Sequence, residues 1–223
     1  MGGVFRPILA GATLRDRVVA CFGALIGIGV TGLAARALLP GQPVPALILT
    51  ASMGASAVLL FAVPASPLAQ PWPIIGGNTI SALSGLVVAH LIPDPMLAGA
   101  VAVSLAIAAM SLARCLHPPG GGTALIAVLG GPAVAATGWL FPFVPVALNA
   151  VLLVGAGWLF HRVSGHAYPH RQTPVVAPPS PGLVVTDADI EAALIQFGEP
   201  LDISRDDLRA IAQSAATHAA RRP

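Results

Sequence analysis

The sequence has no lysine and few charges of either sign. Only 9% of its 223 residues are charged, whereas 56% are hydrophobic, and the mean hydropathy is +0.83. Between Val18 and Phe160 the only formal charges are Arg36, Asp94 and Arg114. Soluble domains carry about 25% charged residues, so this scarcity of charge excludes a soluble domain over most of the chain. It leaves apolar runs that can cross a hydrocarbon core of roughly 30 Å. The sequence predicts an integral membrane protein.

Cysteine is also scarce, and no pattern supports a metal, cofactor or nucleic-acid site. Cys21 and Cys115 lie in or beside apolar runs without metal-ligand or disulfide spacing. The arginines cluster at the ends of the runs and in the tail rather than on one face, which argues against a nucleic-acid partner. We expect no metal, no cofactor and no nucleic acid. The expected partners are the lipid bilayer and a small-molecule or anion substrate, with a homo-oligomer as an open alternative.

Six apolar segments are candidate spans of an all-α, polytopic helical membrane protein. They cover residues 18–39, 44–63, 74–92, 96–116, 123–140 and 143–161. The second and fifth open or break at small residues, so both are expected to be broken or re-entrant. The prediction is four full spans plus two broken elements, with six spans as the upper limit. Either number is even, so both termini lie on one side.

Arginine placement predicts which side that is. Arg6, Arg15 and Arg17 precede the first span and Arg162 and Arg171 follow the last, whereas the loop at Asp94 has no positive residue. Positive-inside logic places both termini in the cytoplasm, and we expect a bacterial inner membrane.

Four regions follow one another along the chain. Residues 1–17 are an N-terminal cytoplasmic segment, 18–171 the transmembrane domain and 172–185 a proline-rich linker. Residues 186–223 form a soluble tail of two short helices, with Thr186 and Ser204 as N-caps and Gly198 ending the first helix.

The transmembrane domain contains two similar halves. ARALLP (35–40) and ARCLHP (113–118) share arginine and proline spacing, and GASAVLLFAVP (54–64) resembles GGTALIAVLGGP (121–132). Asn78 and Asn149 then sit singly in the third and sixth segments. This pattern predicts an inverted repeat of three elements each, about 18–92 and 96–161, as in many secondary transporters. Chance resemblance of apolar sequence is the alternative.

The stretch RCLHPPGGGT (114–123) is the strongest candidate site. Pro118 and Pro119 should end one span, the glycines should let the backbone turn, and Thr123 should open the next helix. Free N–H groups there would face a cavity and attract anions, with positive charge from Arg114 and His117. The candidate substrate-binding residues are Arg114, His117, Pro118, Pro119, Gly120, Gly121, Gly122 and Thr123, then Gly54, Ala55, Ser56 and Arg36 of the first copy, Asn78, Asn149, Ser66 and Gln70.

Each candidate has a plainer interpretation. Arg36 and Arg114 lie near span ends, where arginine reaches to lipid phosphate. His117 is in place to cap a helix end, and the two asparagines can serve as interhelical hydrogen-bonding groups. Ser66 and Gln70 belong to PASPLAQPWP (64–73), which is either a neutral turn or an element packed on the membrane domain as a gate or wall.

These motifs resemble the HPP family of integral membrane proteins, named for the tripeptide at residues 117–119. The resemblance rests on residues 54–72, GGN (76–78) and MSLARCLHPPGGGTAL (110–125), with a weaker block at YPH (168–170), and covers about 15–171. It implies about four transmembrane helices and a transport role. Some plastid and cyanobacterial relatives are linked to nitrite movement.

Three functions remain to be weighed. The first is a membrane transporter or channel for a small solute, above all a small anion such as nitrite or a related oxyanion. The second is an intramembrane hydrolase in which Ser56 is activated by His90 or His117. Ala57 replaces a glycine of that motif, so we assign no catalytic residue and expect no enzyme. The third is a scaffold or sensor that acts through the tail.

Overall fold

The computed structural model describes residues 13–40, 49–170, 185–197 and 202–220. The predicted linker at 172–185, the stop at Gly198 and most of the segment 1–17 lie outside the described residues. The chain divides after Pro169 into two compact units, which are treated separately here. All regular elements of the described ranges are helical. This confirms the predicted all-α class.

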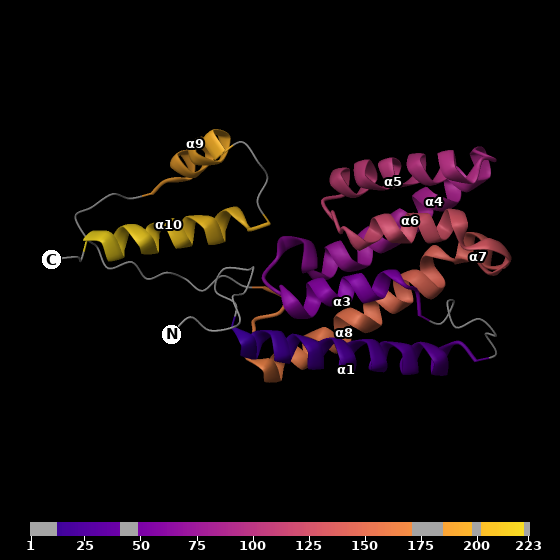
Figure 1. Ribbon diagram of the computed structural model, residues 1–223, viewed down its shortest axis with the longest axis horizontal. Helices are drawn as coiled ribbons and strands as arrows, with labels where there is room; N and C mark the ends of the chain where they lie inside the picture. Colours follow the sequence, from indigo (N-terminus) through magenta and orange to yellow (C-terminus); the bar gives the residue numbers. More distant parts are fainter. Residues whose placement is uncertain (1–12, 41–48, 171–184, 198–201, 221–223) are drawn as a thin grey trace. The chain divides into compact units, whose positions relative to one another are not determined.

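The first unit is a polytopic bundle of α-, 3-10 and π-helical elements (Figure 1). The elements are α1 (Leu14–Leu38), α3 (Ser52–Ala62), η1 (Pro67–Ala69), η2 (Pro73–Gly77), α4 (Asn78–Leu91), α5 (Pro95–Leu112), α6 (Pro119–Leu129), α7 (Gly131–Thr137), η3 (Gly138–Leu140), η4 (Pro142–Ala147) and α8 (Leu148–Ser164).

Four of these helical segments are long and apolar enough to cross a membrane. They are Leu14–Leu38, Pro73–Leu91, Pro95–Leu112 and Pro142–Ser164. The other two elements are short or broken: α3 has 11 residues, and the pair Pro119–Leu129 and Gly131–Leu140 is bent by 92°. Four full spans with two broken elements, as predicted, are therefore confirmed.

Two helix starts differ from the predicted ones for local reasons. α1 begins at Leu14 rather than Val18, because Thr13 and Asp16 form a capping box one turn before the apolar run. α6 begins at Pro119 rather than Thr123, because proline suits the first helical position and all three glycines adopt helical geometry behind it. The break in the fifth segment consequently falls later, where Gly131 has a φ of +63°.

The six main elements pack as two groups of three. α1, α3 and α8 contact one another, α5, α6 and α4 contact one another, and α3 meets α6 between the groups. If α1 corresponds to α5, α3 to α6 and α4 to α8, each contact in one group has a counterpart in the other. The direction of the chain alternates through both sets and is opposite in the second (Figure 1). This arrangement is the one that an inverted repeat predicts.

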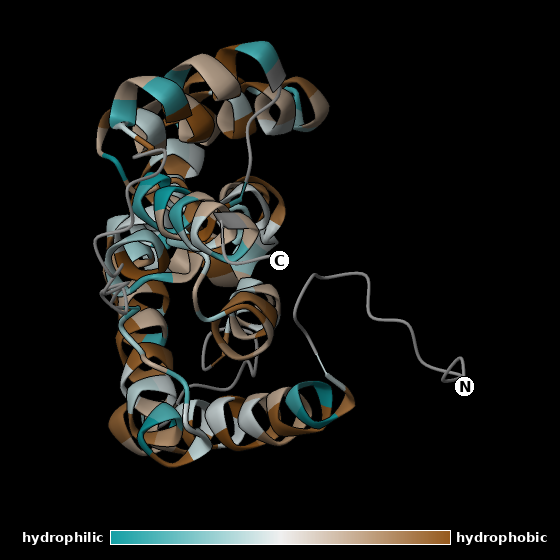
Figure 2. Cartoon of the chain, turned by 90° about the vertical axis from the view of Figure 1, so that its left-hand side faces the viewer, coloured by the Kyte–Doolittle hydropathy of each residue, from teal (hydrophilic) through white to brown (hydrophobic). Residues whose placement is uncertain are grey.

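The outer surface of the bundle is apolar, as contact with lipid tails requires. Figure 2 shows many hydrophobic stretches along the helices of this unit. On α1 the exposed large side chains are Leu14, Val18, Phe22, Leu25, Ile26, Val30, Leu33 and Leu38. The start of α1 and the end of α8 lie together, because Asp16 is 4.0 Å from His166.

The second unit is a pair of helices, α9 (Asp187–Phe197) and α10 (Arg205–Ala220). The predicted N-caps are confirmed, since Thr186 Oγ1 accepts from the Asp189 N–H at 3.3 Å and Ser204 Oγ from the Asp207 N–H at 3.0 Å. Ion pairs and a side-chain bond join the elements of this unit: Arg205 with Glu191, Arg209 with Asp187, and the Val185 N–H with Gln213 Oε1.

Removing the cap of α10 should loosen its first turn. Burial raises the pKa of Asp207. Hydrogen bonds from Ser204 and His170 and the charge of His170 together lower it by more, so the pKa lies below its usual value. We expect Ser204→Ala to cost about 1 kcal/mol, seen as roughly fivefold faster hydrogen exchange of the first-turn amides at pH 7. Because the folded pKa is depressed, the contribution of Asp207 is present above the unfolded carboxyl pKa of about 3.9 and disappears as the pH falls through the folded value. Equal exchange rates in both proteins would contradict this.

Candidate functional site

His117 is fully buried and is bonded at both ring nitrogens. Nδ1 lies 2.8 Å from the carbonyl oxygen of Leu68, and Nε2 lies 2.8 Å from Ser56 Oγ. A carbonyl can only accept, so Nδ1 carries the proton, and in the neutral ring Nε2 accepts from the Ser56 hydroxyl. The imidazole thus joins the segment before η2 to α3.

Ser56 is also fully buried and has an alternative acceptor. Its hydroxyl lies 3.1 Å from the carbonyl oxygen of Ser52, one turn earlier in α3. The hydroxyl has one proton, which can go either to His117 or to Ser52. If His117 were protonated, Nε2 would donate to Ser56 and the serine proton would turn to Ser52. Both charge states of the imidazole can therefore be satisfied by the same side chains.

Asn78 extends this network to α4 and α6. Its Nδ2 donates to Ile74 O at 2.8 Å and to Ser56 Oγ at 3.3 Å, and its Oδ1 accepts from Thr123 Oγ1 at 2.6 Å. Asn78 and Thr123 are fully buried. The side chains of His117, Ser56, Asn78 and Thr123, called here the central cluster, form one connected set where α3 and α6 meet.

Two glycines allow the chain to bring His117 this deep. A Cβ at Gly77 would lie 2.6 Å from His117 Cβ, and one at Gly120 would lie 2.5 Å from Ser81 Oγ. Both glycines are buried, so any side chain at either position would separate α4 from the start of α6. Both glycines therefore serve close packing within the protein, and Gly120 does not form the turn that the sequence predicted.

The expected anion-binding helix end is not where the sequence placed it. Thr123 lies inside α6, and the first N–H groups of that helix are occupied: Gly120 donates to His117 O at 2.8 Å and Gly121 to Pro118 O at 3.0 Å. Pro118 and Pro119 have no N–H. The prediction of free N–H groups at this helix end is therefore wrong. Prolines at its start leave few such groups, and local carbonyls accept from those that remain.

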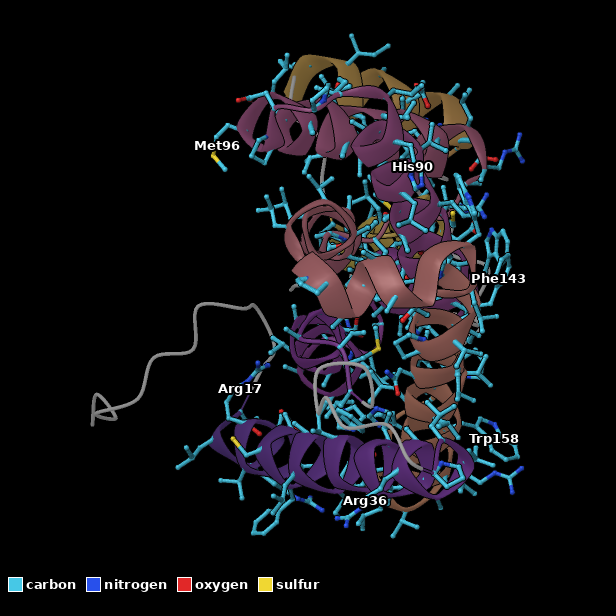
Figure 3. The ribbon with its side chains drawn as sticks, turned by 90° about the vertical axis from the view of Figure 1, so that its right-hand side faces the viewer. Arg17, Arg36, His90, Met96, Phe143 and Trp158 are labelled. Atoms are coloured by element: carbon cyan, nitrogen blue, oxygen red, sulfur yellow. The ribbon has the colours of Figure 1, made fainter. Side chains whose placement is uncertain are left out.

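The remaining candidates are divided between the cluster and the surface. Gly54 and Ala55 lie on the exposed side of α3, away from Ser56, and Gly122 is exposed on α6. Arg36 and Arg114 are exposed at the ends of α1 and α5, and Figure 3 shows Arg36 directed outward. The structure thus brings His117, Ser56, Asn78 and Thr123 together but leaves both arginines outside.

Ser66 and Gln70 shape the irregular segment rather than enter the cluster. Ser66 Oγ accepts from the Leu68 N–H at 3.1 Å, and Gln70 Nε2 donates to Pro64 O at 2.9 Å. The segment is bound to three other parts of the unit, through Leu68 O to His117, Ala69 O to Tyr168 Oη and Trp72 Nε1 to Ala113 O. It packs against the bundle, as one of the two interpretations of PASPLAQPWP expected.

Two further histidines differ in their surroundings. His90 is exposed and stacked on Trp139, with ring centroids 5.0 Å apart. It is therefore not brought to Ser56. His161 is buried in α8 and lies 2.9 Å from Leu60 O through Nε2. His161 was not among the predicted site residues, because its only signal was a histidine in an apolar run. The carbonyl of Leu68 was not predicted either, because every residue has a main-chain carbonyl.

Asn149 occupies the place in the second half that Asn78 has in the first. Both asparagines follow a π-helical turn, η2 before Asn78 and η4 before Asn149. Asn149 is fully buried, yet neither Nδ2 nor Oδ1 has a hydrogen-bond partner. Among the described residues, the only other buried side-chain atom in this condition is Arg17 Nε.

The fold and the cluster define a class of protein: a polytopic helical membrane protein with paired short or broken elements around a buried polar centre. The chain belongs to the HPP transmembrane region family, which it matches over residues 10–169. Two transmembrane proteins of Dictyostelium discoideum are similar to it, at 42% identity over 111 residues and 39% over 112 residues. Each match covers 48% of this chain but only 39% and 36% of the relatives' lengths. No solved structure matches the chain significantly.

Arg114 has a structural role that explains its position without reference to a ligand. It has a φ of +54°, its N–H donates to Ser111 O at 3.2 Å, and the Cys115 N–H donates to Met110 O at 2.9 Å. These two bonds form a Schellman motif at the end of α5, and Arg114 holds the position that glycine usually occupies.

Arg114→Gly should therefore stabilise the protein. Glycine adopts positive φ without a Cβ clash, so we expect a gain of about 1 kcal/mol in unfolding free energy, whereas Arg114→Ala keeps the strain and gains little. Denaturant unfolding of both variants in detergent micelles measures this difference. A glycine variant no more stable than the alanine variant would show that the turn carries no strain.

Proposed function

We propose that this chain is a transporter or channel for a small solute, with a small anion such as nitrite or a related oxyanion as the substrate class. The observation that carries the proposal is the central cluster. Polar side chains buried at membrane depth are costly, and they are retained mainly where they line a path or a site. Three of them lie on α3, α4 and α6, and the fourth, His117, lies just before α6; all four converge where the two halves of the protein meet.

The arrangement of the halves supports a transport cycle. α3 and α6, the two middle elements of the repeat, contact each other at the cluster. In transporters built from inverted repeats, movement of one half against the other exposes a central site alternately to each side. The hydroxyls of Ser56 and Thr123 lie at the same point of their respective repeats, so a solute between α3 and α6 would meet similar groups from either direction.

The cluster also offers a means of coupling a proton to the solute. His117 is its only titratable member, and Ser56 can accept from or donate to it without any backbone movement. Imidazole changes charge near physiological pH in water. A solute that displaced the serine hydroxyl would change the partner of Nε2 and, with it, the preferred protonation state.

Nitrite uptake into liposomes tests the proposal directly. Chloride and formate serve as competitors, and the compared proteins are the native chain, His117→Ala, His117→Gln and Arg114→Ala. Removing the imidazole leaves the buried Leu68 O unpaired at about 1–3 kcal/mol and removes the group that joins the irregular segment to α3. Uptake should therefore fall by roughly tenfold or more. Arg114→Ala should retain uptake because its side chain is exposed.

The variants also distinguish the possible causes of a loss of uptake. His117→Gln preserves a donor and an acceptor, so a partial recovery relative to alanine would assign the loss to hydrogen bonding rather than to misfolding, which gel filtration checks. If the folded native protein took up none of the tested anions, the anion class would be wrong. Loss of uptake in Arg114→Ala but not in His117→Ala would move the site to the surface.

An intramembrane hydrolase is the second candidate, and one distance favours it. Ser56 Oγ and His117 Nε2 are 2.8 Å apart, and Leu68 O orients the imidazole through Nδ1, as a nucleophile and its base require. The Nδ2 of Asn78, 3.3 Å from Ser56 Oγ, is the nearest side-chain donor for a developing oxyanion. Full burial of Ser56 means that a substrate could reach it only after the helices separate.

Labelling with a fluorophosphonate separates the two candidates. A transporter should not react, so the native protein and Ser56→Ala should show the same background after incubation in micelles and in liposomes. Labelling of the native chain that Ser56→Ala abolishes, with the adduct mapped to Ser56 by mass spectrometry, would instead establish an activated serine.

A further inference from the structure

The two corresponding asparagines of the repeat are in opposite states. Asn78 uses both ends of its carboxamide on Ile74, Ser56 and Thr123, whereas the carboxamide of Asn149 bonds to nothing although it is fully buried. Leaving a buried amide unpaired carries a penalty, and such groups are rare in native proteins. A ligand that pairs with both ends of this amide would remove the penalty.

The register of α8 places Asn149 on the side that faces the middle of the bundle. Val146, one turn before it, packs in a cluster with Ala82 of α4 and Ala127 of α6. Leu153, one turn after it, packs with Met53, Ala57 and Leu60 of α3. The amide consequently lies between the contact of α8 with α3 and the contact of η4 with α4, on the helix face shared by Val146 and Leu153.

No ionisable side chain on the packed elements faces this amide. The sequences of α3, α6, η2 and η4 contain no ionisable residue at all. On α1, Cys21 and Arg36 are exposed, and the first turn lies beside the other end of α8, where Asp16 is 4.0 Å from His166.

The other ionisable residues of the packed region have surroundings that do not include Asn149. His117 has both ring nitrogens bonded within the protein, Cys115 packs in the separate core cluster of α4, α5 and α6, and His90 and Arg114 are exposed. On α8 itself the first ionisable residue after Asn149 is His161, 12 residues or roughly 18 Å along the helix; Arg162 follows it.

We propose that the Asn149 carboxamide binds the transported solute in an uncharged form that offers one hydrogen-bond donor and one acceptor. This inference rests on the proposed transport function and specifies the chemical form of its substrate. An amide without a neighbouring cation matches a neutral partner, because its NH₂ donates while its carbonyl accepts. A bare anion would satisfy Nδ2, leave Oδ1 unpaired and bring an uncompensated charge into the membrane.

For an oxyanion this means that a proton travels with it. Nitrite or formate takes a proton from the aqueous phase on one side, and the resulting O–H donates to Asn149 Oδ1 while the second oxygen accepts from Nδ2. The acid releases that proton to water on the other side. One anion and one proton move together, so no net charge crosses the membrane.

Asn149→Leu is the variant that isolates this contact. The amide has no protein partner to lose, so an apolar group of similar size should leave the thermal unfolding midpoint in micelles unchanged or raise it. Ser84→Ala is the matched control, since Ser84 is a buried hydroxyl of α4 that bonds only to its own helix, at Ile80 O.

The experiment measures uptake of nitrite, formate and the permanently neutral formamide into liposomes at pH 7.5, with protein-free liposomes subtracted. Internal pyranine records protons, and potassium with valinomycin sets the membrane potential. We expect one proton for each anion, rates independent of potential, facilitated formamide entry, and a loss of roughly tenfold in Asn149→Leu with none in Ser84→Ala.

Each contrary result has a separate meaning. Anion uptake that follows the membrane potential and carries no proton would overturn the uncharged form. Full uptake by Asn149→Leu would overturn the role of this residue. In either case, transport itself would stand. No uptake of any of the three solutes by the folded native chain would overturn the proposed function, and the inference with it.

Discussion

Hydrocarbon offers a buried polar group no water to bond, and the His117 imidazole meets this constraint by bonding at both ring nitrogens. Its two partners belong to segments that are distant in sequence, so satisfying one ring fixes the position of both. Leu68 O holds the irregular segment against the bundle, and Ser56 leads through Asn78 to Thr123 and hence to α4 and α6. The broken elements α3 and α6 are therefore aligned by polar contacts inside an otherwise apolar bundle.

The spans and their number were predictable from the sequence, because hydropathy and segment length are properties of each stretch of chain by itself. The scarcity of charge between Val18 and Phe160 was enough to predict four full spans. The small residues at Gly54 and Gly120 marked the two short or broken elements, although both glycines lie inside helices and the bend falls at Gly131. Helix ends were less predictable, since Thr13 with Asp16 and the proline at Pro119 shift them by about one turn.

The site was predictable by residue type but not by role. A buried histidine, serine, threonine and asparagine stand out in an apolar chain, whereas their pairing depends on tertiary packing. The glycines illustrate the difference: the sequence predicted a turn at Gly120, yet Gly120 and Gly77 act by allowing close packing of neighbouring elements. Arg36 and Arg114 drew attention by charge, and the fold places both at the exposed ends of helices. The partner of His117 at Leu68 is a main-chain atom, which sequence cannot distinguish from any other carbonyl.

The crossed packing of the repeats affects how the protein is made. α4 belongs to the first half in sequence but packs with α5 and α6, and α8 completes the group that begins with α1 and α3. A nascent chain that has released only its first half can form the contact between α1 and α3, but it lacks α8, which packs against both. The early helices must wait for the last span to be synthesised, so this bundle can close only near the end of translation.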